Sequence, residues 1–220
     1  MSVHVLVRVW LPDRPGALGA VASRIGSTRG DIIGIDVLER GETVAVDEFA
    51  VELEHDDVIP MLVREIEEVD GAAVEEVRIV STFPDPRLDA LNSATQLCEA
   101  DQAEALHIVL VSHIRKEFLA DWAALVVTTD VLATAGESPA AGLLQALVAG
   151  TGASPLVAEG ATGPDDLAVA TLDRNGAALL VGRAGHPFRR RERAQLLALA
   201  RIADRAWQLL NIGAATEPSR

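Results

Sequence analysis

The spacing of apolar residues changes once within the first 21 residues, at a Pro-Gly pair, and this change limits what the N-terminal part can form. Valine occupies every second position from Val3 to Val9, as in a strand with one buried face. After the segment PDRPGALGAV at 12–21, apolar residues recur with the 3.6-residue period of an amphipathic helix. The pattern predicts a strand that passes through a short turn directly into a helix.

The order of the elements that follow predicts the fold of this part. Further strands are expected at 31–39, 43–53 and 74–80, and a second helix at 57–71. The resulting β-α-β-β-α-β order is the ferredoxin-like arrangement. We therefore expect an α+β protein whose first domain comprises residues 1–83.

The rest of the chain predicts a second domain at 88–212, an α/β domain with long helices at both ends. An apolar repeat predicts one long helix from Leu88 toward Phe118, and a mixed sheet is expected to follow. The other expected elements are strands at 123–127, 167–172 and 177–182, a helix near 139–149, a final amphipathic helix at 189–211, loops at 150–154 and 159–166, and a disordered tail at 213–220.

The charge and the apolar pattern exclude several classes of partner. The chain carries 33 acidic and 19 basic residues, a formal net charge of −14, which repels nucleic-acid phosphates. It contains no uncharged apolar run long enough to cross a membrane. The N-terminus does not look like a signal peptide, and the single cysteine, Cys98, cannot form an internal disulfide. We expect a cytoplasmic protein with neither nucleic acid nor membrane as a partner.

The second domain shows no pattern of catalytic residues. Cys98 has no obvious base nearby in the sequence and is expected to be a small buried hydrophobe. His107 and His113 are six residues apart and do not share a helical face, so we expect structural or surface roles and no metal site. The basic segment FRRRER at 188–193 is interpreted as a solvated face or as a contact with the acidic first domain. No enzyme activity and no cofactor are expected.

The loop before the first helix has two interpretations. Gly16 allows close approach to the backbone, and the N–H groups of Gly16, Ala17 and Leu18 would point out of a helix start that attracts anions. Pro15 fits the first position of that helix, and Asp13 could bind an ammonium group. Such a site suits an α-amino acid. The alternative is a plain turn between strand and helix, with Asp13 as the helix cap.

At these residues the sequence resembles the ACT domain family. The resemblance covers about residues 3–80 and rests on DRPGALGAVASRIGSTRGDI and on the element order. It implies a regulatory module that binds an amino acid between two copies. Asp13, Gly16, Ala17 and Leu18 would form one wall of the site, and Asp31 would approach from the partner subunit. Some amino-acid-binding members have asparagine at both aspartate positions, which leaves the identity of the ligand open.

The end of the chain resembles a second family. The segment LDRNGAALLVGRAGHPFRRRERAQLLALARIADRAW is similar to the C-terminal part of GAF domains, and the resemblance covers about residues 88–211. It implies a sensory module that binds a small molecule or dimerises through its terminal helices. We find no cysteine placed for a chromophore and no phosphate-binding motif, so no tetrapyrrole or cyclic nucleotide is expected.

Together these observations predict a non-catalytic regulatory protein. We expect it to sense a small metabolite, with an amino acid as the first candidate, at an ACT dimer interface in a homodimer or larger assembly. The alternative is a ligand-independent regulatory subunit that acts on a separate metabolic enzyme or signalling partner.

Overall fold

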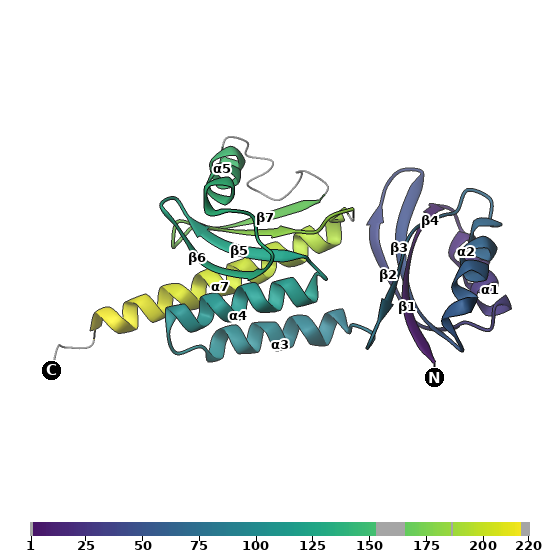
Figure 1. Ribbon diagram of the computed structural model, residues 1–220, viewed down its shortest axis with the longest axis horizontal. Coiled ribbons are helices and arrows are strands. Elements are labelled where there is room, and N and C mark those ends of the chain that lie inside the picture. Colours follow the sequence, from purple (N-terminus) through teal and green to yellow (C-terminus); the bar gives the residue numbers. More distant parts are fainter. Residues whose placement is uncertain (1, 153–165, 186, 217–220) are drawn as a thin grey trace. The chain divides into compact units, whose positions relative to one another are not determined.

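The chain folds into two compact units, Met1–Pro84 and Asp85–Arg220, each built on its own four-stranded sheet (Figure 1). The computed structural model describes residues 2–152, 166–185 and 187–216. Of the two loops predicted at 150–154 and 159–166, residues 153–154 and 159–165 lie outside the described residues, and residues 150–152 belong to the helix Ala141–Gly152. Within those residues, no helix is long and apolar enough to cross a membrane.

The first unit has the predicted β-α-β-β-α-β order. Its elements are β1 (Val3–Pro12), α1 (Ala17–Ser27), β2 (Asp31–Arg40), β3 (Val44–Leu53), α2 (Ile59–Glu67) and β4 (Ala73–Val80). The strands lie in the order β2-β3-β1-β4, and each pairs with its neighbour in antiparallel register. Both helices cover the same face of this sheet (Figure 1). The ferredoxin-like prediction is confirmed.

Alternation along β1 and β3 explains why the helices cover one face. Val5, Val7 and Val9 of β1 are fully buried beneath the helices, together with Phe49 and Val51 of β3. The helix-facing residues follow the period-2 alternation of a strand. Leu6 and Arg8 point to the opposite face and are also buried, at 3 % and 2 % exposed, so β1 is not the strand with one buried face that the sequence predicts. The helices contribute Ala17, Val21, Ile25, Leu62 and Ile66 to the same core.

The second unit also places helices on a sheet. Its elements are α3 (Pro86–Glu99), α4 (Ala103–Glu117), β5 (Trp122–Val127), β6 (Asp130–Gly136), α5 (Ala141–Gly152), β7 (Leu167–Leu172), β8 (Ala177–Gly182) and α7 (Arg190–Thr216). The strand order is β6-β5-β8-β7. Every described pair is antiparallel, so the prediction of a mixed sheet is wrong. Short turns join β5 to β6 and β7 to β8, and such turns can only connect antiparallel strands.

Both faces of this second sheet are covered. On one face α4 and α7 pack against the strands, with α3 outside them, and α5 lies on the other face (Figure 1). Leu125 and Leu179 point toward α4 and α7, whereas Ala124 and Leu180 point toward α5. Because both faces of the sheet are buried, the sequences of these strands are continuous apolar runs.

The long helix predicted toward Phe118 is in fact two helices. Ala100 is extended, with φ −62° and ψ 130°, and α4 begins after Gln102. The chain folds back here, so that Leu106 and Leu110 of α4 are fully buried while Leu91 of α3 is 66 % exposed. One continuous helix could not bury the apolar side of α4 against the sheet. Neither glycine nor proline marks the break, which is why the sequence pattern does not predict it.

The stripe predicted on the final helix packs inside its own unit. Its members belong to the core shared with α4 and the sheet: Leu196, Ala200, Ala203, Trp207 and, partly buried, Leu210. This stripe therefore cannot serve as a dimer contact without opening the unit.

The final helix also continues to Thr216, so the prediction of a disordered tail is wrong for residues 213–216, where two alanines favour helix. Residues 217–220 lie outside the described part.

Two side-chain predictions in the second unit are wrong. Cys98 is exposed, because α3 is covered on one side only and Leu97 takes the inward position. Arg193, in the basic segment interpreted as solvated, is 9 % exposed, and its Nε donates to the carbonyl of Phe188. Arg190 of the same segment is exposed.

Candidate functional site

The loop between β1 and α1 is built around the backbone conformation of Gly16. Gly16 is the N-cap of α1, with φ 90° and ψ −15°, a left-handed conformation that favours glycine. A Cβ at this position would meet nothing within 4 Å, so the conformation and not packing requires glycine. The helix begins at Ala17, so the prediction that Pro15 occupies its first position is wrong. No side chain caps this helix, which also excludes Asp13 as the cap.

The start of α1 leaves backbone donors without partners in the described part of the chain. The first hydrogen bond inside the helix runs from the N–H of Ala20 to the carbonyl of Gly16, at 2.9 Å. The N–H of Ala17 donates to the carbonyl of Arg14, at 3.2 Å. The N–H groups of Gly16, Leu18 and Gly19 have no such bond among the described residues. With the positive end of the helix dipole, they can receive an anion.

Asp13 is held by the far end of β2. Its Oδ1 accepts a hydrogen bond from Nη2 of Arg40 at 2.7 Å, and its own N–H donates to the carbonyl of Thr43 at 2.9 Å. The Arg40 side chain is 68 % exposed and that of Asp13 is 24 % exposed. The carboxylate expected to bind an ammonium group therefore already has a cation beside it.

Asp31 does not join this loop within one chain. It opens β2 opposite Glu52, whereas Arg40 closes the strand opposite Ala45. A ten-residue strand spans about 30 Å at about 3.3 Å per residue, which separates Asp31 from the loop. The structure thus brings together Asp13, Pro15, Gly16, Ala17 and Leu18 and leaves Asp31 at the opposite end of the sheet.

Asp47 is a residue of this region that the sequence analysis did not single out. It pairs with Val9 of β1 and Val37 of β2, on the face of β3 that the helices cover. The residue is 4 % exposed, and its Oδ1 is buried without a hydrogen-bond partner in the described structure. Burial raises the pKa of Asp47; the charge of Arg40 lowers it and that of Asp13 raises it further. The sequence signal that could have found Asp47 is the alternation along β3, because Asp47 is two residues after the buried Ala45 and so points to the same face.

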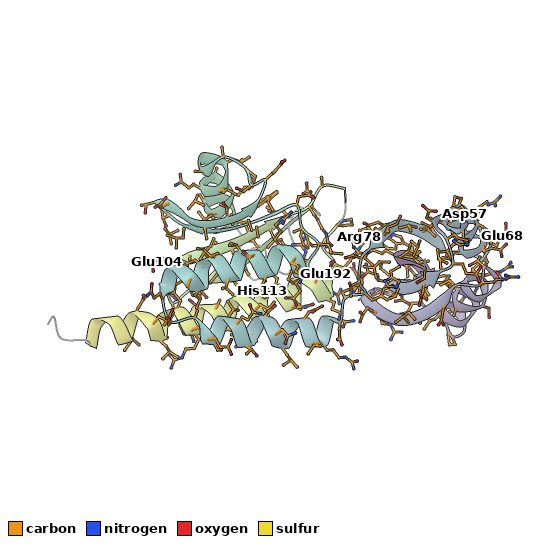
Figure 2. The ribbon with its side chains drawn as sticks, turned by 60° about the horizontal axis from the view of Figure 1, so that its bottom comes forward. Asp57, Glu68, Arg78, Glu104, His113 and Glu192 are labelled. Carbon is orange, nitrogen blue, oxygen red and sulfur yellow. The ribbon has the colours of Figure 1, made fainter. Side chains whose placement is uncertain are left out.

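The other polar cluster of interest lies between helices of the second unit. Oγ of Ser93 on α3 donates to Oε2 of Glu117 at 3.0 Å and lies 3.3 Å from Nδ1 of His113, which is labelled where α4 meets α3 in Figure 2. Nε2 of Gln195 on α7 donates to Oε1 of Glu117. Burial raises the pKa of Glu117 and lowers that of His113. Ser93 is 3 % exposed and bonds the carboxylate directly, so this arrangement joins helices and does not present a nucleophile.

His107, the other histidine considered in the sequence analysis, is a packing residue. His107 is 6 % exposed, and its ring meets the ring of Trp207 edge-on at 4.2 Å between centroids. Burial lowers the pKa of His107. Within the described ranges, no three His, Cys, Asp or Glu side chains gather in an arrangement that could hold a metal ion.

Comparison with known proteins points to the first unit. Residues 5–71 match the model of the ACT domain family. Similar solved structures include a crystal structure and a solution NMR structure of the ACT domain from GTP pyrophosphokinase of Chlorobium tepidum. Each is 14 % identical, with a TM-score of 0.31. The match to the crystal structure covers 36 % of this chain and 100 % of the crystallised chain. The match to the NMR structure covers 38 % of this chain and 92 % of the other. No curated protein matches the chain.

The family match supports a regulatory module that binds small ligands. It covers the segment from β1 to α2, which includes the Gly16 loop, Arg40 and Asp47. The resemblance of the second unit to GAF domains stays a prediction. At residues 5–71 the chain carries an ACT domain.

Proposed function

We propose that the first unit binds a small amino acid at the Gly16 loop, between two copies of the chain, and that the protein is regulatory and has no catalytic activity. The observation that carries this proposal is the helix start. Gly16, Leu18 and Gly19 offer N–H groups without partners in the described structure, and the space in front of Gly16 is open. This geometry suits a carboxylate.

The exposed edge of the first sheet supports a shared site. β2 is an edge strand, and Ile33, Ile35 and Val37 on it are 52 %, 40 % and 42 % exposed. An exposed apolar edge strand can pair with a second chain. Antiparallel pairing of two β2 strands about a two-fold axis would bring Asp31 of the partner subunit toward Arg40 and the loop. This is how Asp31 could reach a ligand that it cannot reach within one chain.

A panel of common amino acids at millimolar concentration, read by thermal shift and then by calorimetry, tests the proposal. At least one should raise the melting temperature, and Gly16→Val should abolish its binding, because the side chain would fill the approach to the N–H groups. Gly176→Val is the matched control. Gly176 also has a positive φ, of 62°, and open space around it, but it lies in the β7–β8 turn. Equal binding by Gly16→Val would place the ligand elsewhere.

A ligand-independent regulatory subunit is the second candidate. Leu88, Leu91 and Ile108 on α3 and α4 are 53 %, 66 % and 61 % exposed, and exposed apolar residues are typical of contact surfaces. If no amino acid binds the wild-type chain, co-purification from the native cell would test for an enzyme or signalling partner.

A further inference from the structure

The buried carboxylate of Asp47 has no hydrogen-bond partner in the described fold. It projects into the face of the first sheet that α1 and α2 cover, between Val9 and Val37, and is 4 % exposed. Burying an ionised carboxylate without a partner is unfavourable. A protein that keeps such a group in its core either keeps it protonated or provides a cation when it functions.

The charges around Asp47 leave one negative charge unbalanced. The charged groups that act on it are Arg40, at the end of β2, and Asp13, in the loop after β1. Arg40 already donates to Asp13 at 2.7 Å. When all three groups are ionised, two negative charges face one positive charge. A second cation of small size would balance this cluster.

The same region also offers donors to an anion. Asp13 is three residues before Gly16, and α1 starts at the next residue with N–H groups that have no partner in the described structure. Asp13, whose charge acts on Asp47, therefore belongs to the same loop that offers these N–H groups. A ligand that carries both an ammonium and a carboxylate group can use both.

We propose that Asp47 provides the counter-charge for the ammonium group of the ligand, a small primary amine. The inference rests on the proposed function for the place of the ligand, and it goes further in naming the group that receives the amine. In this arrangement Asp13 stays paired with the exposed Arg40, and the buried carboxylate of Asp47 receives the ammonium group of the ligand. The carboxylate of an amino acid would then meet the N–H groups of Leu18 and Gly19.

The test compares the full-length wild type with Asp47→Asn, which keeps the shape of the side chain and removes its charge. The probes are the common amino acids, the hydroxy acids that match them with hydroxyl in place of ammonium, and the amines ethanolamine and putrescine. Calorimetry should show affinity for an amino acid or an amine fall about ten- to a hundred-fold in the variant, the range for a charged hydrogen bond. Asp57→Asn, at an exposed acid labelled in Figure 2, is the matched control and should bind like wild type.

The outcomes separate this inference from the proposed function. An amino acid that binds wild type and Asp47→Asn equally, or a hydroxy acid that binds as well as its amino acid, overturns the role of Asp47 and leaves the site in place. Amines that bind through Asp47 while no amino acid binds support the inference and overturn the amino-acid proposal. If no probe binds wild type, both are overturned. If Asp47→Asn does not fold, NMR of the Asp47 carboxyl carbon in the wild type replaces it: a bound amine must shift that signal and lower the pKa.

Discussion

At the scale of single residues, the ion pair of Asp13 and Arg40 decides how firmly the loop before α1 is held. Arg40 is mostly exposed, and exposed ion pairs contribute about 0–1 kcal/mol to stability. In the described part of the chain, the N–H of Asp13 also donates to the carbonyl of Thr43, in the turn before β3. A ligand can therefore rearrange the loop at low energetic cost while the sheet beneath it stays intact.

The buried Asp47 predicts an unusual dependence of stability on pH. Because burial raises its pKa, the folded chain holds a proton there more tightly than the unfolded chain, whose aspartates titrate near about 3.9. Stability from this group is therefore lost as the pH rises from that value through the folded pKa. Asp47→Asn should melt at a higher temperature than wild type at neutral pH, and the difference should shrink toward about pH 4.

Scanning calorimetry across this range checks the sign. Asp57→Asn, at an exposed position, should show no such trend. An Asp47→Asn chain that is less stable than wild type at neutral pH would show that the fold stabilises the ionised carboxylate of Asp47.

At the scale of elements, β2 is the part of the first unit that an assembly would use. It pairs on one side only, with β3, and Ile33, Ile35 and Val37 on it are exposed. Register shifts near Gly34 and Leu38 interrupt its pairing with β3. Bulges of this kind are common at sheet edges and bend a strand away from unwanted pairing, so any partner must match this particular edge.

We expect sedimentation at micromolar concentration to show at least a dimer. Ile35→Glu should convert it to a monomer, because the substitution places a charge in the β2 contact. Leu91→Glu, at an exposed site on α3, is the matched control and should leave the assembly unchanged. Dissociation by Leu91→Glu alone would place the contact on the helices of the second unit.

Elements whose pattern is local could be predicted from the sequence, and those fixed by tertiary packing could not. The strands of the first unit follow alternation, and the β7–β8 turn follows Asn175-Gly176. The helix breaks after Glu99 because α4 must fold back onto the sheet. No residue near the break, such as glycine or proline, indicates this in the sequence. For the same reason Gly16 could be predicted, since its turn is local, whereas the lack of a partner for Asp47 depends on three strands and a loop.

At the scale of the whole molecule, the chain is two units with separate cores. Among the described residues, the core of the first unit comes from the segment between β1 and β4, and that of the second from α3 onward. Each core is therefore complete in its own part of the sequence. A small domain of this kind typically has a few kcal/mol of stability.

The fragment 1–84 should therefore fold without the rest of the chain. Its thermal unfolding should be cooperative, and amide exchange should protect the central strands β1 and β3 most strongly. A fragment whose amides exchange without protection would show that the first unit depends on the second.

The placement of the tryptophans gives each unit its own optical signal. The sequence has three tryptophans and no tyrosine. Trp10, on β1, donates from Nε1 to Glu75 at 3.1 Å and is the indole of the first unit. In the second unit Trp122 covers Gly182, where a Cβ would clash with the indole ring, and Trp207 meets His107. Fluorescence of a Trp10→Phe chain would therefore come from the second unit alone, and the difference from wild type would report on the first unit.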